Sequence, residues 1–211
     1  MKISKFQHAC LVIEEGKTVI VVDPGNLSSD FIMPHKVDAI VITHEHADHF
    51  DESLVNQILT KNPKAEVIAH QSISGRFTNY SAVAAKPGES HVVGDISLRF
   101  FGGQHAQIAE GIQVPANIAV LFNERLFYPG DSFATPEGVD VQELALPVAA
   151  PWLKISEPMA YLGAIKPSFA FPTHDQILSA EGKEIADRMI GAVASGIGAT
   201  YRRLDGLKIE L

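Results

Sequence analysis

The chain lacks several features that would define other classes of protein. Its 211 residues include a single cysteine, Cys10, which excludes an internal disulfide framework and any metal site built from a cluster of cysteines. Its longest apolar runs, such as residues 39–42, are far shorter than the roughly 20 residues that span a bilayer. Residues 1–8 contain no apolar stretch of the kind found in signal peptides. We therefore expect a soluble, cytoplasmic protein with no membrane partner.

Positive charge is also scarce, because 17 Lys and Arg stand against 25 Asp and Glu, which gives a formal net charge of −8. A general nucleic-acid binder needs a basic face, so we expect no nucleic-acid partner. The net charge does not exclude a local basic pocket. A hydrophobic fraction of 46% with only 20% charged residues excludes a mostly disordered chain. The length fits one domain or two tightly fused halves, and we treat residues 1–211 as a single domain.

Strand and helix patterns fill the chain. Strands are predicted at residues 9–14, 18–23, 37–43, 66–70, 91–93, 96–101, 117–122, 125–128, 141–146 and 168–172. Helices are predicted from Asp51 onward and at residues 72–80, 156–165 and 180–193. The apolar faces within 54–59 and 185–193 are expected in the core. This order favours an α/β fold in which two mixed sheets pack together with helices outside.

Histidine is what the chain has in abundance, with nine in all. Residues 43–49 read THEHADH and place three imidazoles and a carboxylate between a predicted buried strand and a helix start. Neutral imidazole and carboxylate are good ligands for Zn²⁺ and similar ions. His44 and His46 can face one metal while Asp48 and His49 face a second, about 3.5–4 Å away as in two-metal hydrolytic sites. A solvated loop with chance histidines is the weaker alternative.

Three later residues offer further ligands, and each follows the end of a predicted strand. They are His105 after GGQ, Asp131 after YPG and His174 after FPT. Each alone is weak evidence, because a single histidine after a strand more often forms a structural hydrogen bond. Together with residues 43–49 they complete two coordination spheres, which a chance arrangement would rarely do.

At this point the chain resembles the metallo-β-lactamase-fold hydrolase superfamily, from about residue 3 to about residue 190. The matching motifs, in order, are Asp23 in VVDPG, the four ligands of THEHADH, His105 in GGQHA, Asp131 in YPGDS and His174 in PTHD. Two longer stretches, FQHACLVIEEGKTVIVVDPG and ELALPVAAPW, are similar to the branch that contains the ascorbate-phosphate lactonase and phospholipase-D-like enzymes.

The resemblance implies a four-layer αβ/βα sandwich with a centre for two divalent metal ions. One metal would be bound by His44, His46 and His105, the other by Asp48, His49 and His174, and Asp131 would bridge the two. Asp23 would orient a ligand imidazole through a hydrogen bond. His8 matches a histidine of the similar branch and would act in the same way, with a merely packed histidine as the alternative. Zinc is the expected metal, and manganese or iron suit the same ligands.

The charges of such a centre predict its chemistry. Two divalent ions, two carboxylates and one hydroxide leave about one positive charge inside an acidic chain. We expect a hydroxide that bridges the two metals to be the nucleophile, with Asp48 and Asp131 as the catalytic carboxylates. The positive charge favours a small anionic molecule with an ester, lactone or phosphoester bond as the substrate.

The remaining candidates carry weaker expectations. Lys154 and His70 are candidate substrate contacts, although a solvated lysine and a packed histidine are the commoner roles. Trp152 either walls a pocket or packs in the core. His35 and His91 are expected to be solvated loop residues.

Three other functions compete with a hydrolase of this kind. A phosphodiesterase or nuclease is disfavoured by the acidic balance, and a non-catalytic metal-binding module by the full ligand set. Among iron-dependent oxidoreductases of the fold, the di-iron branch typically carries Glu where His46 stands, while the mononuclear-iron branch stays open. Substrate specificity is expected in the loops at residues 24–36, 71–90, 106–116 and 132–154. The sequence leaves the oligomeric state open.

Overall fold

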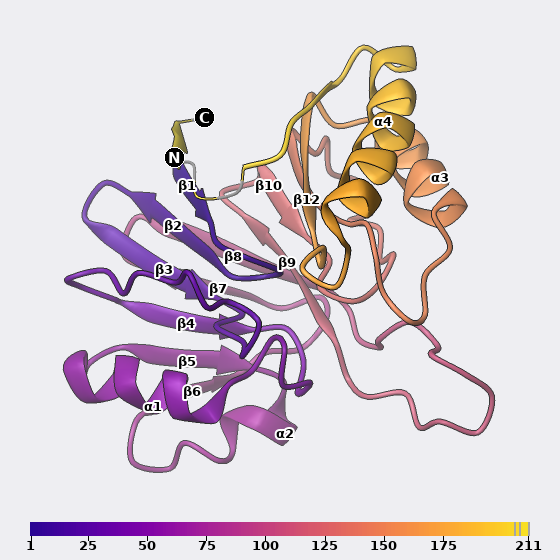
Figure 1. Cartoon of the computed structure of the whole chain (residues 1–211). Helices are drawn as coiled ribbons and strands as arrows, with labels where there is room; N and C mark the ends of the chain where they lie inside the picture. Colours follow the sequence, from indigo (N-terminus) through magenta and orange to yellow (C-terminus); the bar gives the residue numbers. More distant parts are fainter. Residues whose placement is uncertain (205, 207, 211) are drawn as a thin grey trace.

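The computed structural model describes residues 1–204, 206 and 208–210. Two seven-stranded sheets pack face to face, and helices cover their outer faces (Figure 1). The predicted α/β sandwich of two sheets with helices outside is therefore confirmed. Within the described residues, no helix is both long enough and apolar enough to cross a membrane.

The first sheet has the strand order β14-β1-β2-β3-β4-β5-β6. Its strands are β1 (Lys2–Lys5), β2 (Leu11–Glu15), β3 (Thr18–Val22), β4 (Ala39–Ile42), β5 (Glu66–Ala69), β6 (Ser81–Ala84) and β14 (Lys208–Glu210). Helices α1 (Glu52–Lys61) and α2 (Gln71–Ser74) belong to this half. From β3 to β6 neighbouring strands are parallel, so their carboxyl ends meet at one edge of the sheet.

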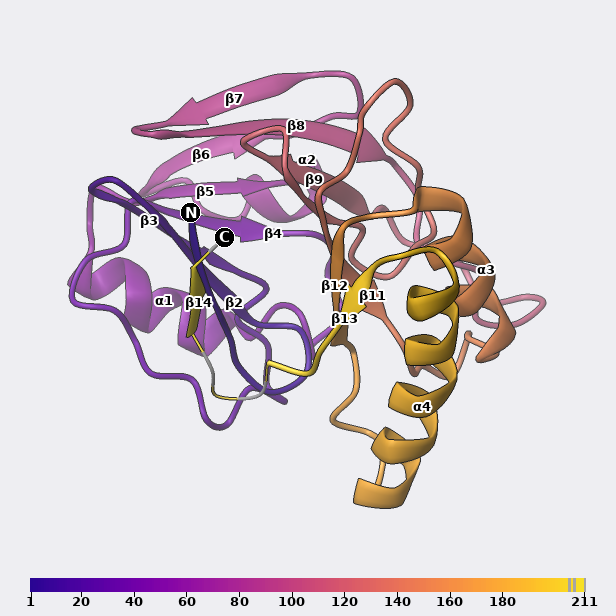
Figure 2. The same ribbon diagram turned by 90° about the horizontal axis from the view of Figure 1, so that it is seen from above.

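The second sheet has the order β13-β12-β11-β10-β9-β8-β7. Its strands are β7 (Ser90–Val93), β8 (Ile96–Gly102), β9 (Ile118–Phe122), β10 (Leu126–Tyr128), β11 (Glu143–Pro147), β12 (Phe169–Thr173) and β13 (Thr200–Tyr201). Helices α3 (Ser156–Ile165) and α4 (Ala180–Gly196) cover its outer face (Figure 2). From β10 to β13 the strands are parallel, as in the first sheet.

Three apolar layers hold the sandwich together. The central layer lies between the sheets and includes Ile13 and Ile20 from one side and Phe100 and Val120 from the other. An outer layer packs α1 on the first sheet, and another packs α3 and α4 on the second. Burying large apolar side chains of this kind contributes roughly 1.5–3 kcal/mol each. The two sheets therefore form a rigid base for the loops at their edges.

The predicted first helix is observed, and its start is explained by its cap. The side chain of Asp51 accepts hydrogen bonds from the backbone N–H groups of Ser53 and Leu54. The predicted core face of α4 needs one correction, because Ile185 is 48% exposed although Ile190 on the same helix is buried. Ile185 points away from the sheet, into the apolar cavity described below.

Other predictions were wrong in places where local patterns are weak. The helix predicted at 72–80 is only the single turn α2, since Gly75 follows it and residues 81–84 pair with β5 as strand β6. Strands β1, β6, β13 and β14 were missed because short strands gain their stability from neighbouring strands rather than from their own sequence. His35 is exposed as predicted. His91 is not a loop residue, because it lies half-buried in β7 with Nε2 2.7 Å from Glu66 Oε2.

Candidate metal centre

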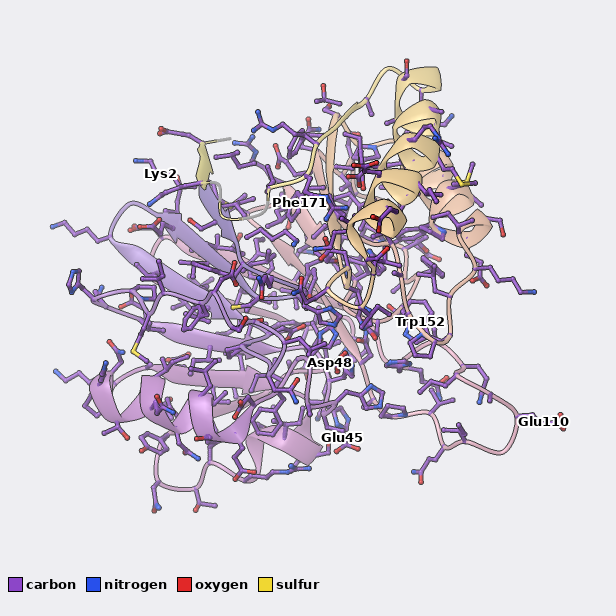
Figure 3. The ribbon with its side chains drawn as sticks, viewed as in Figure 1. Lys2, Glu45, Asp48, Glu110, Trp152 and Phe171 are labelled. Carbon is purple, nitrogen blue, oxygen red and sulfur yellow. The ribbon has the colours of Figure 1, made fainter. Side chains whose placement is uncertain are left out.

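Side chains from both sheets gather where the strands end, near the labelled Asp48 and Trp152 in Figure 3. The structure brings together all seven residues predicted to bind metal, and it adds His8. They form two groups in which the candidate ligand atoms lie within 4.8 Å of one another. The first group is His44, His46, His105 and Asp131, and the second group is His8, Asp48, His49 and His174.

The loop after β4 carries four of these residues. Its first residue, Thr43, is fixed by Asp23 at the end of β3, since the Thr43 backbone N–H donates to Asp23 Oδ1 (2.8 Å) and its hydroxyl donates to Asp23 Oδ2 (2.6 Å). Gly25 is needed on the other side, because a Cβ there would lie 1.8 Å from the backbone oxygen of Asp48. The chain around Asp23 thus sets the course of the ligand loop.

Three of the buried histidine ligands each donate a hydrogen bond from one ring nitrogen, which leaves the other ring nitrogen facing the centre. His105 Nδ1 donates to the Ala106 carbonyl (2.6 Å) and His174 Nδ1 to the Ala149 carbonyl (2.5 Å). His49 Nδ1 donates to Asp23 Oδ2 (2.7 Å). Because a carbonyl or carboxylate can only accept, these bonds fix the tautomer that leaves Nε2 free to bind metal.

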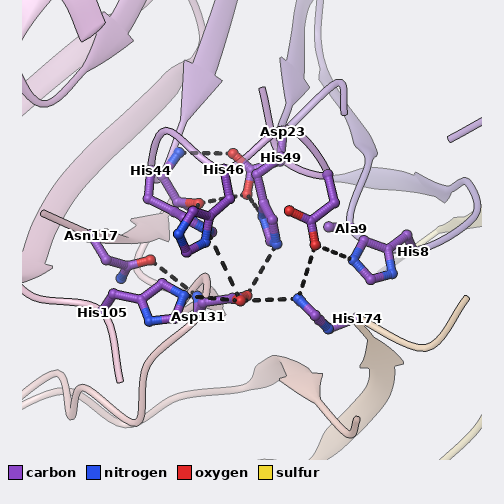
Figure 4. A network of polar contacts seen from close by, with 12 residues as sticks. His8, Ala9, Asp23, His44, His46, His49, His105, Asn117, Asp131 and His174 are labelled. Atoms are coloured by element: carbon purple, nitrogen blue, oxygen red, sulfur yellow. Dashed lines mark hydrogen bonds and ion pairs between the residues drawn. The ribbon is translucent and has the colours of Figure 1, made fainter. Parts of the chain in front are cut away.

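Asp131 lies between the two groups (Figure 4). Its Oδ2 atom is 3.0 Å from His174 Nε2, 3.3 Å from His105 Nε2 and 3.9 Å from His44 Nε2. Its Oδ1 atom is 3.1 Å from His49 Nε2. The carboxylate therefore faces imidazoles of both groups, which is the position expected of a bridging ligand.

Asn117, directly before β9, holds the backbone of Asp131. Its Oδ1 atom accepts from the Asp131 N–H (3.0 Å), and its Nδ2 donates to the Pro129 carbonyl (2.9 Å). The intervening Gly130 has φ +60°, and a Cβ at this position would lie 2.5 Å from Asn117 Oδ1. A turn this tight accepts only glycine.

Three buried atoms test whether a metal fits. His49 Nε2, His105 Nε2 and Asp131 Oδ1 point into the centre and have no hydrogen-bond partner among the described residues. The contacts of the two nitrogens with the Asp131 carboxylate, at 3.1 Å and 3.3 Å, are ion-pair distances without hydrogen-bond geometry. Buried polar atoms normally have a partner, and leaving one without costs about 1–3 kcal/mol. One divalent cation in each group would satisfy all three atoms, and the nitrogen and oxygen donor set suits zinc, manganese or iron. The residues therefore fit a pair of divalent cations.

The pKa values of the metal-free groups differ. Burial lowers the pKa of His44 well below its usual range, and burial with His105 nearby lowers the pKa of His46. Burial also disfavours the charged forms of His49 and His174, but nearby carboxylates, Asp131 first, outweigh it and raise both pKa values, that of His174 to about 9. Without a cation, the carboxylates are balanced by protons on the second group.

Asp23 and His8 contact the ligands from behind. The buried Asp23 carboxylate also accepts from the Tyr128 hydroxyl (2.8 Å), and His8 Nε2 lies 3.0 Å from Asp48 Oδ2. The His8 carbonyl accepts from the His174 backbone N–H (3.0 Å). His8, Asp23 and His174 all have left-handed backbone conformations, with φ of +64°, +45° and +58°. Such non-glycine residues are strained and cluster at functional sites.

Several site residues had no predicted role. Asn117 and Tyr128 give no local signal, because a buried Asn and a strand Tyr are common without function. The sequence allows two roles for Trp152, and the structure places its indole Nε1–H as a donor to Asp131 Oδ2 at 3.1 Å.

The two candidate substrate contacts lie outside both groups. His70 caps α2, since its Nδ1 accepts from the Ser72 N–H (3.3 Å). Lys154 is exposed just before α3, and its backbone N–H donates to Glu157. Contact of either residue with substrate stays a prediction.

Two cavities adjoin the centre. A polar cavity of about 160 Å³ opens beside the first group and is lined by Glu45, His46, Gln113 and Pro115. An apolar cavity of about 350 Å³ lies between residues 148–155 and the start of α4. It shares Ala149, the partner of His174, with the site.

Comparison with known sequences identifies relatives. The family described as "Beta-lactamase superfamily domain" matches residues 2–174. The chain is 37% identical over 191 residues to protein Rv0786c of Mycobacterium tuberculosis, covering 88% of this chain and 89% of the relative. It is 29% identical over 185 residues to UPF0173 protein PF0020 of Pyrococcus furiosus, covering 82% and 83%. A UPF0173 metal-dependent hydrolase of Bacillus mycoides is 34% identical over 98 residues, covering 43% and 41%.

Solved structures share the architecture. Igni18, a metallo hydrolase of Ignicoccus hospitalis, has a TM-score of 0.76 at 18% identity, covering 100% of this chain and 98% of its own. The metallo-β-lactamase fold protein YhfI of Bacillus subtilis has a TM-score of 0.73 at 14% identity, covering 100% and 99%. CmlA, a diiron β-hydroxylase of Streptomyces venezuelae, has a TM-score of 0.75 at 14% identity, covering 100% and 54%. These likenesses show a common fold, and the ascorbate-phosphate lactonase branch remains a prediction.

Proposed function

This chain belongs to the β-lactamase superfamily domain family, and from that premise we propose that it is a metal-dependent hydrolase with a binuclear centre. The observation that carries the proposal is the pair of ligand groups that share Asp131. The relative from Bacillus mycoides is named a metal-dependent hydrolase, which supports the same assignment. We treat residues 1–211 as one domain.

Two bound divalent cations would supply a Lewis acid and a water that ionises near neutral pH. His44, His46 and His105 would hold one cation, Asp48, His49 and His174 the other, and Asp131 would contact both. We expect zinc, with manganese or iron as alternatives that the same ligands accept.

The Asp48 and Asp131 carboxylates differ in solvent exposure, and this difference suggests different roles. The Asp48 side chain is 25% exposed, whereas that of Asp131 is 3% exposed. Asp48 can therefore orient an incoming water and accept its proton, while Asp131 stays buried and fixes the spacing of the groups. No serine or cysteine nucleophile is needed.

The charge balance supports a small anionic substrate with an ester, lactone or phosphoester bond. Positive charge at the centre would come from the cations, within a chain of net charge −8. Preorganised charge of this kind stabilises the negative oxygen that develops in the transition state of acyl or phosphoryl transfer. The polar cavity beside His46 offers a path to the centre.

Metal analysis combined with a substrate screen tests the proposal. We expect two metal ions per chain and hydrolysis of at least one compound among lactones, phosphodiesters, thioesters and β-lactams. Asp131→Ala should lose both metal and activity, while Asp140→Ala, which removes an exposed carboxylate outside the centre, should lose neither. Full activity of Asp131→Ala with unchanged metal content contradicts the proposal, and iron with oxygen consumption points to an oxidoreductase instead.

A further inference from the structure

Trp152 is the only tryptophan in the chain and lies in the loop between β11 and α3, at the metal centre (Figure 3). Its indole Nε1–H donates to Asp131 Oδ2 at 3.1 Å. The ring also meets the rings of His105 and His174 edge-on, with centroids 5.7 Å and 6.3 Å away. Trp152 therefore contacts the candidate bridging ligand and one imidazole from each group.

The hydrogen bond selects one of the two oxygens of Asp131. Oδ2 faces His105 of the first group and His174 of the second, whereas the nearest imidazole to Oδ1 is that of His49. A carboxylate rotates easily about its Cβ–Cγ bond, because this torsion has a broad energy minimum. One directed donor on Oδ2 therefore favours the orientation that keeps this oxygen between the two groups.

The indole is itself held in place from behind. The ring of Phe133 meets it edge-on at 5.6 Å, and the ring of Tyr161 in α3 lies 5.1 Å from Phe133. The Tyr161 hydroxyl donates to the Ala134 carbonyl. The loop that carries Trp152 also contains Ala149, whose carbonyl accepts the hydrogen bond from His174 Nδ1. Supports of this kind keep a ligand within the narrow geometry that a metal site requires.

We propose that Trp152 is a positioning residue that fixes the rotation of Asp131, so that the carboxylate stays turned toward the imidazoles of both groups. This inference rests on the proposed binuclear function. It predicts that the indole N–H matters for holding two metals together more than for holding one, because an Asp131 free to rotate still serves a single group.

Metal titration of Trp152→Phe tests this, because phenylalanine keeps an aromatic ring and removes the N–H donor, together with one ring of the indole. Zinc binding to metal-free protein, followed by competition with a chelator, should show the weaker site losing affinity by about 10–100-fold. The tighter site should change by no more than a few-fold. Phe133→Leu is the matched control, because it loosens the packing of the ring and keeps the indole N–H, so the weaker site should lose less affinity than in Trp152→Phe.

Two results overturn the inference: unchanged affinities in Trp152→Phe, or an equal loss in Phe133→Leu, which would make the role one of packing. If the unmodified protein does not bind two zinc ions, the proposed function fails instead, so the two failures are distinguishable.

A second measurement needs no variant. One tryptophan gives one indole N–H signal in the ¹H–¹⁵N spectrum of the intact protein. We expect this proton to exchange slowly with water and its signal to shift when zinc is added. Exchange at the rate of a free indole, with no shift on zinc addition, contradicts a bond to Asp131.

Discussion

The two ligand groups are built on different backbones. The unusual turns that lead to His105 and Asp131 in the first group are made by glycines, with φ of +76° at Gly102, +130° at Gly103 and +60° at Gly130. Glycine adopts these conformations without steric cost. In the second group the left-handed residues are members of the group themselves, the ligand candidate His174 and its neighbour His8.

This difference between the groups shows that the second group places functional side chains on strained backbone, whereas the first does not. A non-glycine residue in the left-handed region costs of order 1–3 kcal/mol unless surrounding contacts compensate. At His174 the compensation includes the backbone bond to His8 and the ring bond to Ala149. The second group therefore depends on contacts between distant segments, while the first depends on flexible residues beside its ligands. Variants that remove those contacts should affect the second group more.

The largest effect is expected at Asp23, whose carboxylate accepts from His49, Thr43 and Tyr128. In Asp23→Asn, asparagine has the shape of aspartate and tolerates the left-handed backbone. Its amide NH₂ is a donor, however, and would face groups that themselves donate. We expect metal affinity of the second group to fall about 10–100-fold and the free energy of unfolding to fall by about 1–3 kcal/mol.

Chelator competition and denaturant unfolding measure the two effects. Asp38→Asn is the control, because Asp38 also accepts a backbone N–H of β3, that of Val19, but lies outside the centre. Equal losses of affinity at both metal sites would contradict the contrast between the groups.

A smaller effect is expected at His8, and two substitutions separate ring from backbone. His8→Gly and His8→Ala both remove the contact with Asp48, so each should weaken metal binding by the second group about tenfold. Only alanine keeps the left-handed strain at φ +64°, so it should be less stable than the glycine variant by roughly 1 kcal/mol. Thermal unfolding of the metal-free proteins measures that difference, and equal stabilities would show that His8 is unstrained.

The smallest expected effect is on the pH dependence of metal binding. In the metal-free protein, His174 has a pKa raised to about 9 and that of His49 is also raised, so both hold protons at pH 7. Burial keeps His44 and His46 neutral. Metal binding to the second group must displace protons, so its affinity should rise with pH up to about 9, while that of the first group stays nearly constant.

Calorimetry in buffers of different ionisation enthalpy counts the protons released at each site. The predicted difference between the groups is contradicted if metal binding releases equal numbers of protons at the two sites. It is also contradicted if the metal affinity of the second group does not change from pH 7 to 9.

The gathering of the seven ligand candidates was predictable in part, because each follows the end of a strand, and β4, β10 and β12 each have a parallel neighbour whose end lies at the same edge. His105 is the exception, since it follows β8, which is antiparallel to both of its neighbours. The spacing of residues 43–49 is local and can be read directly. The left-handed turns of His8 and His174 could not be predicted, since the backbone hydrogen bond that joins them connects segments far apart in the sequence. The donor to Asp131 was equally hidden, because Trp152 lies 21 residues away along the chain. The roles of these residues stay proposals.

Strand β1 runs between β2 and β14, so a segment that precedes all the candidate ligands in the sequence pairs with one that follows them all. A chain that folds as it leaves the ribosome has all the candidate ligands, His8 to His174, available before Lys208–Glu210 emerges. Until then, one edge of β1 presents unpaired backbone groups, which favour pairing with other chains.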